Sequence, residues 1–305
     1  VMLDIARDVE RLAPQSTLIN FTNPSGLVTE ALRCHSSVQA IGLCNLPTNL
    51  RIEIATLLAV SPEAVTLDYV GLNHLGWVRG VWVDGQDRMQ EALRAMIAMA
   101  EQERDPVFSP ELLETVGFIP GYYLAFYYHH DRMLAHQRQA SQTRAERARE
   151  IEKELLKLYA DPTVTEKPAL LSERGGERYS TAAISLIASL VNDTGETHIL
   201  NVPNETTFAD LPPQAVVEVP CRVDASGAHP LPAAPIPPHI RGLIQSVKAA
   251  EMLTIQAAIT GDRRTALQAL LAHPLVPSFA AAQSLLAALL VENRDYLPQF
   301  MSGVT

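Results

Sequence analysis

The sequence predicts an α/β fold, with a doubly wound sheet at its start and a mixed α+β portion with many helices after it. Two observations support this expectation. Over the first sixty residues, segments of helical periodicity alternate with short apolar strands, which is the rhythm of parallel strands joined by helices. Beyond residue 85, most periodic segments are long enough for helices, and two more apolar strands interrupt them.

The alternating part begins with an amphipathic segment that Pro14 closes. The first apolar strand ends in the breaker-rich stretch TNPSG (22–26). Pro47 stands where the first turn of a helix tolerates proline, because an N–H would have no partner there. In order, we expect a helix at 2–12, a strand at 17–21, a helix at 26–34, a strand at 38–44 and a helix at 48–60.

Two strands suited to an antiparallel hairpin follow, at 65–71 and 77–85. Between them, His74 is bracketed by Gly71 and Gly76. Strand interiors rarely hold two glycines and a histidine without a reason, because glycine weakens a strand and marks a close approach of backbone or ligand. The hairpin therefore indicates a candidate site at its histidine.

The rest of the chain is expected to be mainly helical. The segment 141–161 is charged on one face and apolar on the other, as is typical of a solvated surface helix. In order, we expect helices at 86–102, 119–131 (aromatic-rich) and 141–161, a small-residue helix that ends near 192, strands at 197–202 and 215–223, a proline-rich loop at 229–238, and helices at 239–260, 263–272 and 279–292.

Composition excludes several classes of partner. The chain has 305 residues, is 47% hydrophobic, carries a formal net charge of −10 and has no run of lysine or arginine, so nucleic acid is not expected as a partner. No apolar run is suited to crossing a bilayer, and three scattered cysteines fit a reducing cytoplasm. An anionic substrate would have to be met by a few local arginines.

Candidate metal ligands lie at strand ends. Cys44 and Asn45 end an expected strand, where α/β sheets place their ligands, and His74 follows thirty residues later. A thiolate and an imidazole suit zinc, manganese, iron or nickel. The alternative is structural: a buried cysteine at a strand end and a histidine satisfied by the backbone.

Two further places could carry chemistry. Asn23 precedes a proline, which favours an extended conformation and projects its amide from a strand end; the alternative is an ordinary Asx turn. Tyr179, in RGGERYS, is flanked by Arg174 and Arg178, and a nearby cation favours the phenolate of a general base. Gly175–Gly176 would allow close approach of the backbone. The alternative is a tyrosine that packs at a helix start.

Taken together and in order, several segments resemble glycoside hydrolase family 4, and within it the 6-phospho-β-glucosidases. The resemblance covers nearly the whole chain, and it is the ordered set that makes it specific. The segments are NFTNPSGLVTEAL, IGLCNLP, GLNHLGW, IPGYYLAFYY, RAREIEKELLKLY, RGGERYS, NDTGETHILNVPN, VVEVPC and NRDYLPQF.

This resemblance implies hydrolysis of a phosphorylated disaccharide or aryl glycoside with NAD and a divalent metal, usually Mn²⁺. In the family's route, NAD⁺ takes hydride from C3 of the sugar, and the metal holds the C2 and C3 oxygens and polarises the ketone. A tyrosine then removes the C2 proton, and the C1–O bond releases the aglycone. Water adds to the alkene, and the hydride returns to C3.

Matched residue by residue, the resemblance implies that Cys44 and His74 bind the metal and that Tyr179 is the C2 base. Asn23 matches a position that lines the sugar and the cofactor. Arg174 is the candidate for the sugar phosphate, from its charge and position.

Asn45 also lines the sugar in this match, and it bears on the linkage that is cleaved. Members that cleave α-linked substrates have an aspartate there, which can protonate the leaving group. An asparagine cannot, so the chain resembles the β-cleaving branch. The family also has a glycine near position 206, where this chain reads NETTFADLP around Asn204.

The family begins with a Rossmann half, but none of the fifteen glycines here falls in a G-x-G-x-x-G pattern. We therefore expect residues 1–45 to be the C-terminal part of a truncated Rossmann-like dinucleotide-binding domain. Residues 46–305 would form the substrate, metal and oligomerisation domain, in a homodimer or homotetramer. This chain alone is then expected to be inactive. The alternatives are a 6-phospho-α-glucosidase, an α-galacturonidase, or a non-catalytic fragment that acts only in association.

Overall fold

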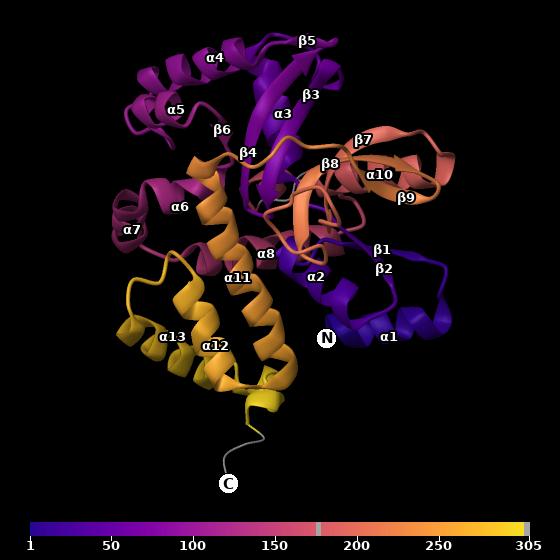
Figure 1. Ribbon diagram of the computed structural model, residues 1–305, viewed down its shortest axis with the longest axis vertical. Coiled ribbons are helices and arrows are strands. Elements are labelled where there is room, and N and C mark those ends of the chain that lie inside the picture. The colour runs from indigo at the N-terminus through magenta and orange to yellow at the C-terminus, as the bar shows by residue number, and fades with distance from the viewer. Residues whose placement is uncertain (175–177, 302–305) are drawn as a thin grey trace.

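The computed structural model describes residues 1–174 and 178–301, and its strands form two sheets (Figure 1). One sheet has the order β1-β2-β7-β8-β9; the other has the order β3-β4-β5, with β6 also paired to β4. The strands are β1 (Thr17–Asn20), β2 (Gln39–Gly42), β3 (Val65–Leu72), β4 (Leu75–Val83), β5 (Gln86–Asp87), β6 (Ile119–Pro120), β7 (Glu196–Pro203), β8 (Val216–Asp224) and β9 (Gly227–Pro230).

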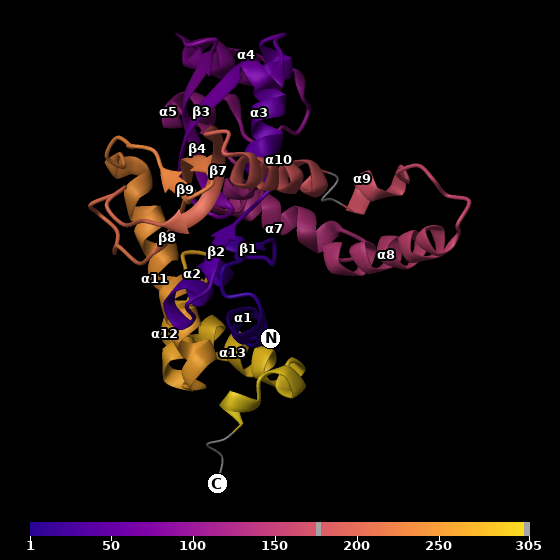
Figure 2. The same ribbon diagram turned by 90° about the vertical axis from the view of Figure 1, so that its right-hand side faces the viewer.

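Helices surround both sheets, and α8 and α9 extend to one side of the molecule (Figure 2). The α-helices are α1 (Met2–Leu12), α2 (Ser25–His35), α3 (Leu46–Leu57), α4 (Met89–Gln102), α5 (Pro110–Val116), α6 (Ala125–Tyr128), α7 (His130–Gln139), α8 (Arg144–Ala160), α9 (Leu170–Arg174), α10 (Tyr179–Asn192), α11 (Pro238–Thr260), α12 (Arg263–Ala272) and α13 (Phe279–Glu292). Short 3-10 turns lie at Pro62–Ala64, Tyr122–Leu124, Arg294–Tyr296 and Pro298–Phe300.

The fold class expected from the sequence is confirmed. Strands β1 and β2 are parallel, in a register that pairs Thr17 with Gln39, and α2 connects them. Strand β2 then pairs antiparallel with β7, where Gly42 lies opposite Asn201. The division after residue 45 stays a proposal; β2 before it and β7 after it belong to one sheet.

Local sequence explains where the charged helix α8 begins. The Thr143 hydroxyl accepts a hydrogen bond from the Glu146 N–H at 3.2 Å, and the Glu146 carboxylate accepts one from the Thr143 N–H at 2.7 Å. This reciprocal capping box satisfies two N–H groups that have no partner inside the helix. The helix expected at 141–161 is therefore confirmed, with its start three residues later.

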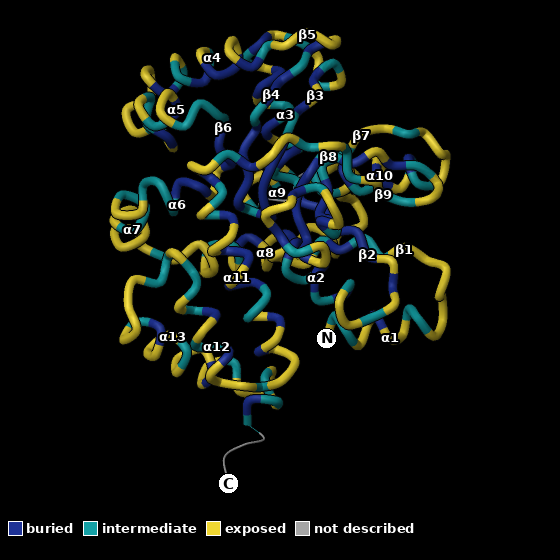
Figure 3. The backbone as a smooth tube through the Cα atoms, viewed as in Figure 1, coloured by how far each residue is buried: buried dark blue, intermediate teal, exposed yellow. Residues whose placement is uncertain are grey.

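The main hydrophobic core lies around the hairpin and β8, where the backbone is buried in Figure 3. The Trp77 and Tyr69 side chains are fully buried there. A separate, smaller cluster joins α1, α2 and β2. Helix α11 is tied to α2 by a buried ammonium: Lys248 Nζ lies 2.6 Å from a carboxylate oxygen of Glu30 and 2.6 Å from one of Glu251.

The expectation of one continuous helix at 119–131 is wrong. Ile119 and Pro120 form β6, which pairs with Val78 and Trp77 of β4. A 3-10 turn and the short α6 follow, and α7 begins at His130. The aromatic-rich pattern wrongly predicted a continuous helix, because the pairing of β6 with the distant strand β4 overrides local helix propensity. The sequence also left α5 unassigned, and β9 extends into the segment expected as a proline-rich loop.

Among the helices in the described part of the chain, none combines the length and hydrophobicity needed to cross a membrane.

Candidate functional site

All six residues singled out from the sequence line one pocket of about 930 Å³. The pocket opens where the segments after β1 and β2, the β3–β4 turn and the facing ends of α8, α9 and α10 meet. Its lining consists of Asn23, Cys44, Asn45, Leu46, Asn49, His74, Tyr122, Tyr123, Arg144, Ala145, Ala148, Ser172, Arg174, Arg178 and Tyr179.

Cys44 is buried, just past the end of β2. The N–H of Leu46 donates a hydrogen bond to its sulfur at 3.5 Å. Burial, and after it the charge of Glu218, raises the pKa of the Cys44 thiol to about 12. The side chain is therefore a neutral thiol by itself, and it would become a thiolate only beside a bound cation.

His74 lies in the turn of the hairpin with a left-handed φ of 64°. The glycines on either side are required by their surroundings. A Cβ on Gly71 would lie 2.1 Å from the Leu75 carbonyl oxygen, and a Cβ on Gly76 would lie 2.1 Å from the Tyr69 hydroxyl. Glycine at both positions lets the two strands close tightly at the turn that carries the histidine.

The His74 ring lies against the Tyr123 ring, with centroids 4.2 Å apart and planes tilted by 30°. Burial lowers the pKa of the imidazole to about 4. At neutral pH the ring is therefore uncharged, which is the form that binds a metal.

Asn23 and Asn45 enter the pocket from two strand ends. Asn23 follows β1 and is joined to Pro24 by a cis peptide bond. Asn45 is the N-cap residue of α3, and its side chain forms no capping hydrogen bond. Its amide is therefore not occupied by the cap of its own helix.

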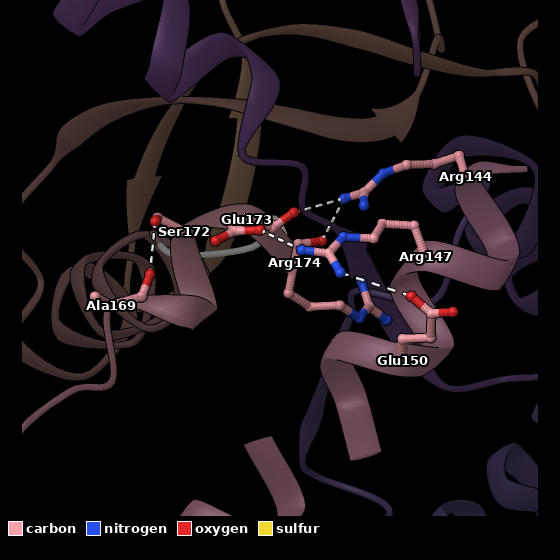
Figure 4. A network of polar contacts seen from close by, with 7 residues as sticks. All are labelled: Arg144, Arg147, Glu150, Ala169, Ser172, Glu173 and Arg174. Carbon is pink, nitrogen blue, oxygen red and sulfur yellow. Dashed lines mark hydrogen bonds and ion pairs between the residues drawn. The ribbon is translucent and has the colours of Figure 1, made fainter. Parts of the chain in front are cut away.

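Arg174 ends α9, which is anchored to the start of α8. Arg144 donates hydrogen bonds to the carbonyl oxygens of Glu173, at 3.0 Å, and of Arg174, at 2.8 Å. Arg147 pairs with the Glu173 carboxylate at 2.7 Å. Figure 4 shows the two α8 arginines reaching across to α9. These contacts hold Arg174 at the rim of the pocket.

The pocket is positively charged although the chain as a whole is acidic. Arg144, Arg174 and Arg178 line it, and no aspartate or glutamate does so among the described residues. In the described part of the chain, neither the Arg174 nor the Arg178 guanidinium forms an ion pair with a carboxylate. A pocket of this kind suits an anion, because charge-assisted hydrogen bonds from guanidinium groups are strong and directional.

Tyr179 is the first residue of α10, and its ring meets Phe21 edge-on with centroids 5.2 Å apart. It lines the same pocket as Cys44 and His74. The expected contribution of Gly175–Gly176 lies outside the described residues.

Sequence reasoning missed several lining residues. Arg144 lies in a segment whose charge pattern predicts a solvated face, so no local signal singles it out. Tyr122 and Tyr123, from the aromatic-rich segment expected as one helix, also line the pocket and are 46% and 38% exposed. Asn204, in the loop without the expected glycine, is not among the lining residues: its amide group donates to the carbonyl oxygens of Phe208 and Leu211, both at 2.9 Å.

A buried polar network lies behind the site. The Glu218 carboxylate is fully buried in β8, and burial raises its pKa to about 7 even though hydrogen bonds from Asn201 and Asn73 oppose the shift. Tyr69 lies beside it, and burial, followed by the charge of Glu218, raises the pKa of the Tyr69 hydroxyl.

The donor set fits a metal that takes additional ligands from the substrate. No group of three or more His, Cys, Asp or Glu side chains in the described part of the chain could hold a metal ion. Cys44 and His74 therefore offer one sulfur and one neutral nitrogen, a pair that transition metals accept. The remaining positions would be left to oxygen atoms of substrate or water.

Comparisons with known sequences give the family. A sequence model described as the family 4 glycosyl hydrolase C-terminal domain matches residues 69–276, and a model described as family 4 glycosyl hydrolase matches residues 1–60. The chain belongs to family 4 of the glycosyl hydrolases. The family resemblance stated from the ordered sequence segments is confirmed.

Relatives cover nearly all of this family 4 chain. It is 38% identical to a probable 6-phospho-beta-glucosidase of Bacillus subtilis, over 100% of this chain and 71% of that protein. The 6-phospho-beta-glucosidase of Thermotoga maritima, solved with manganese, NAD⁺ and glucose-6-phosphate, is 36% identical, with a TM-score of 0.88 over 97% of this chain and 70% of that one. Malate dehydrogenase of Plasmodium falciparum, 15% identical with a TM-score of 0.52 over 85% of this chain and 69% of that one, shares the fold alone.

Proposed function

We propose that this chain supplies the metal and substrate site of a glycosidase that hydrolyses 6-phospho-β-glucosides with NAD and a divalent metal, Mn²⁺ by preference. One observation carries the proposal: Cys44, His74 and Tyr179 converge on a pocket with three arginines and no described carboxylate. The names of the relatives and the ligands of the Thermotoga maritima structure support the same substrate class.

Each lining residue has a role in this proposal. Cys44 and His74 hold the metal, and Tyr179 removes the proton from C2 of the sugar. Bound NAD accepts a hydride from C3 and the metal polarises the C2 and C3 oxygens, which together make the C2 proton acidic. Arg174 binds the phosphate, with Arg144 beside it.

The amides complete the substrate site. Asn23 faces both the sugar and the nicotinamide, and Asn45 faces the sugar near C1. An asparagine cannot protonate a leaving group, so elimination at C1 here does not use a side-chain acid at this position. This feature supports the β linkage over the α linkage.

The proposal extends to the oligomeric state and the cellular compartment. A homodimer or homotetramer is supported by the exposed apolar side chains of Phe279, Leu289 and Val291 on α13. The cytoplasm is the proposed compartment, because NAD and sugar phosphates are intracellular metabolites.

Binding of glucose-6-phosphate in the presence of Mn²⁺, measured by titration calorimetry, tests the proposal. We expect the phosphorylated sugar to bind and glucose to bind at least tenfold more weakly. Arg174→Ala should weaken glucose-6-phosphate binding by about tenfold to a hundredfold, since a charged hydrogen bond is worth about 1.5–3 kcal/mol. Arg149→Ala, an exposed α8 arginine outside the pocket, is the matched control.

Turnover separates the two linkages. Joined to the dinucleotide-binding portion of a family 4 relative and supplied with NAD⁺ and Mn²⁺, the chain should hydrolyse a chromogenic 6-phospho-β-glucoside faster than its α anomer. Equal affinity for glucose and glucose-6-phosphate would contradict the substrate class, and preference for the α anomer would contradict the linkage.

A further inference from the structure

Glu218 is a fully buried carboxylate that the proposed mechanism does not use. Its Oε1 accepts hydrogen bonds from Asn201 Nδ2 at 2.8 Å and from Asn73 Nδ2 at 3.2 Å. A carboxylate is costly to bury, and its hydrogen bonds only partly offset that cost. Its two hydrogen-bond partners, Asn201 and Asn73, connect it to segments that carry residues of the site.

Asn73 uses both ends of its side chain. Its Nδ2 donates to Glu218, and its Oδ1 accepts a hydrogen bond from the N–H of Ser25 at 2.7 Å. Ser25 begins α2, two residues after Asn23. One amide in the hairpin turn therefore connects β8 to the segment that carries a sugar-facing residue, and it directly precedes His74.

Asn201 connects the same carboxylate to β2, which ends two residues before Cys44. Across the β2–β7 pairing, Asn201 lies opposite Gly42. A Cβ on Gly42 would lie 2.7 Å from the Asn201 Cβ, so the two backbones are in close contact. The cysteine lies two residues beyond this contact.

The hairpin turn needs to be held in place. His74 has a left-handed backbone conformation, which a residue with a side chain adopts only where its surroundings over-determine it. The neighbouring amide of Asn73 is only 5% exposed and is bonded at both ends, so it restrains the turn.

We propose that Glu218 is a positioning residue, whose buried carboxylate fixes the His74 turn relative to the end of β2 through Asn73 and Asn201. It touches neither metal nor substrate; apart from the effect of its charge on the Cys44 thiol, it acts through these two amides. This role rests on the proposed function, because the spacing of Cys44 and His74 matters only if both bind one metal.

Mn²⁺ affinity of the metal-free 305-residue chain, measured by calorimetry, tests the role. Groups that orient metal ligands typically change affinity by about 10–100-fold when removed, so Glu218→Ala and Asn73→Ala should each lose that much. Glu218→Gln should stay within about threefold of the wild type, because its amide oxygen can still accept from both asparagines. The double variant Glu218→Ala/Asn73→Ala should be no weaker than either single variant, since the two residues act in one chain of contacts.

Glu251→Ala is the matched control. Glu251 is also a buried carboxylate, but it pairs with Lys248 in α11. Its loss should lower the midpoint of thermal unfolding and leave Mn²⁺ affinity unchanged. A purely structural Glu218 would behave in the same way. Should Glu218→Ala fail to fold, Asn73→Ala and Glu218→Gln decide between the two roles.

The outcomes also separate this role from the proposed function. If the wild-type chain binds Mn²⁺ and Asn73→Ala binds it equally well, the positioning role is overturned while the metal site stands. A Glu218→Gln chain as weak as Asn73→Ala would overturn it too, because the acceptor would not be what matters. If the wild-type chain does not bind Mn²⁺, both the proposed metal site and the positioning role are overturned.

Discussion

Binding of Mn²⁺ to the proposed Cys44/His74 site should release one proton per metal at neutral pH. A metal takes cysteine as thiolate and histidine as neutral imidazole. Burial raises the pKa of Cys44 to about 12, so the metal must displace the thiol proton throughout the neutral range. Burial lowers the pKa of His74 to about 4, so the imidazole has no proton to lose there.

The size of the pH effect on Mn²⁺ affinity follows from the number of protons released. One released proton makes the affinity rise about tenfold per pH unit. Between about pH 6.5 and about pH 8, Mn²⁺ should therefore bind about thirtyfold more tightly, a change of about 2 kcal/mol. Affinity rises with pH, because a lower proton concentration favours the state that has lost the proton.

Calorimetric titration in buffers of different ionisation enthalpy counts the proton directly. The Cys44→Ser variant should bind more weakly and show a nearly flat pH profile, since a hydroxyl keeps its proton. A wild-type chain that releases no proton, or a Cys44→Ser chain with the same pH slope, would refute the thiolate assignment. Release of two protons would show that His74 is charged in the metal-free chain.

Three other expectations concern the base, the buried charges and the glycines. Tyr179→Phe should fold normally and bind glucose-6-phosphate, yet lose about 10²–10⁴ in turnover in the chain joined to a dinucleotide-binding portion; normal turnover would remove it as the C2 base. Lys248→Met leaves the carboxylates of Glu30 and Glu251 buried without a cation, so urea denaturation should show a loss of about 3–5 kcal/mol; a loss below about 1 kcal/mol would contradict this. Gly71→Ala should lose about 3 kcal/mol or more, because φ is 151° and the new Cβ would meet the Leu75 carbonyl oxygen at 2.1 Å. Its control, Gly242→Ala, is exposed in α11 with nothing near the added Cβ and should gain about 0.5–1 kcal/mol in urea denaturation.

Local patterns determined a large share of the fold. The alternation of helical and apolar segments over the first sixty residues predicted the parallel β1–α2–β2 unit. Paired glycines predicted a special hairpin, and Gly71 and Gly76 indeed have no room for a side chain. Such features are readable because the physical requirement falls on a few neighbouring residues.

The candidate site was predictable by a different route. Cys44, His74, Asn23 and Tyr179 each had an ordinary structural alternative, and only their order along the chain indicated a family. The pocket that they share is a property of the folded chain. Residues this far apart along the chain acquire a common chemistry only through tertiary contacts.

Other features of the fold and the pocket depend on tertiary contacts alone. The aromatic segment at 119–131 is broken because Ile119 pairs with Val78 of a distant strand. Arg144 looks like part of a solvated face, yet α9 folds back on it and the pocket forms beside it. Glu218 and Lys248 resemble surface residues in sequence and are buried instead. In each case the residue that makes the decisive contact lies tens to hundreds of residues away along the chain. The local sequence around a charged or aromatic residue does not show whether water or protein will surround it.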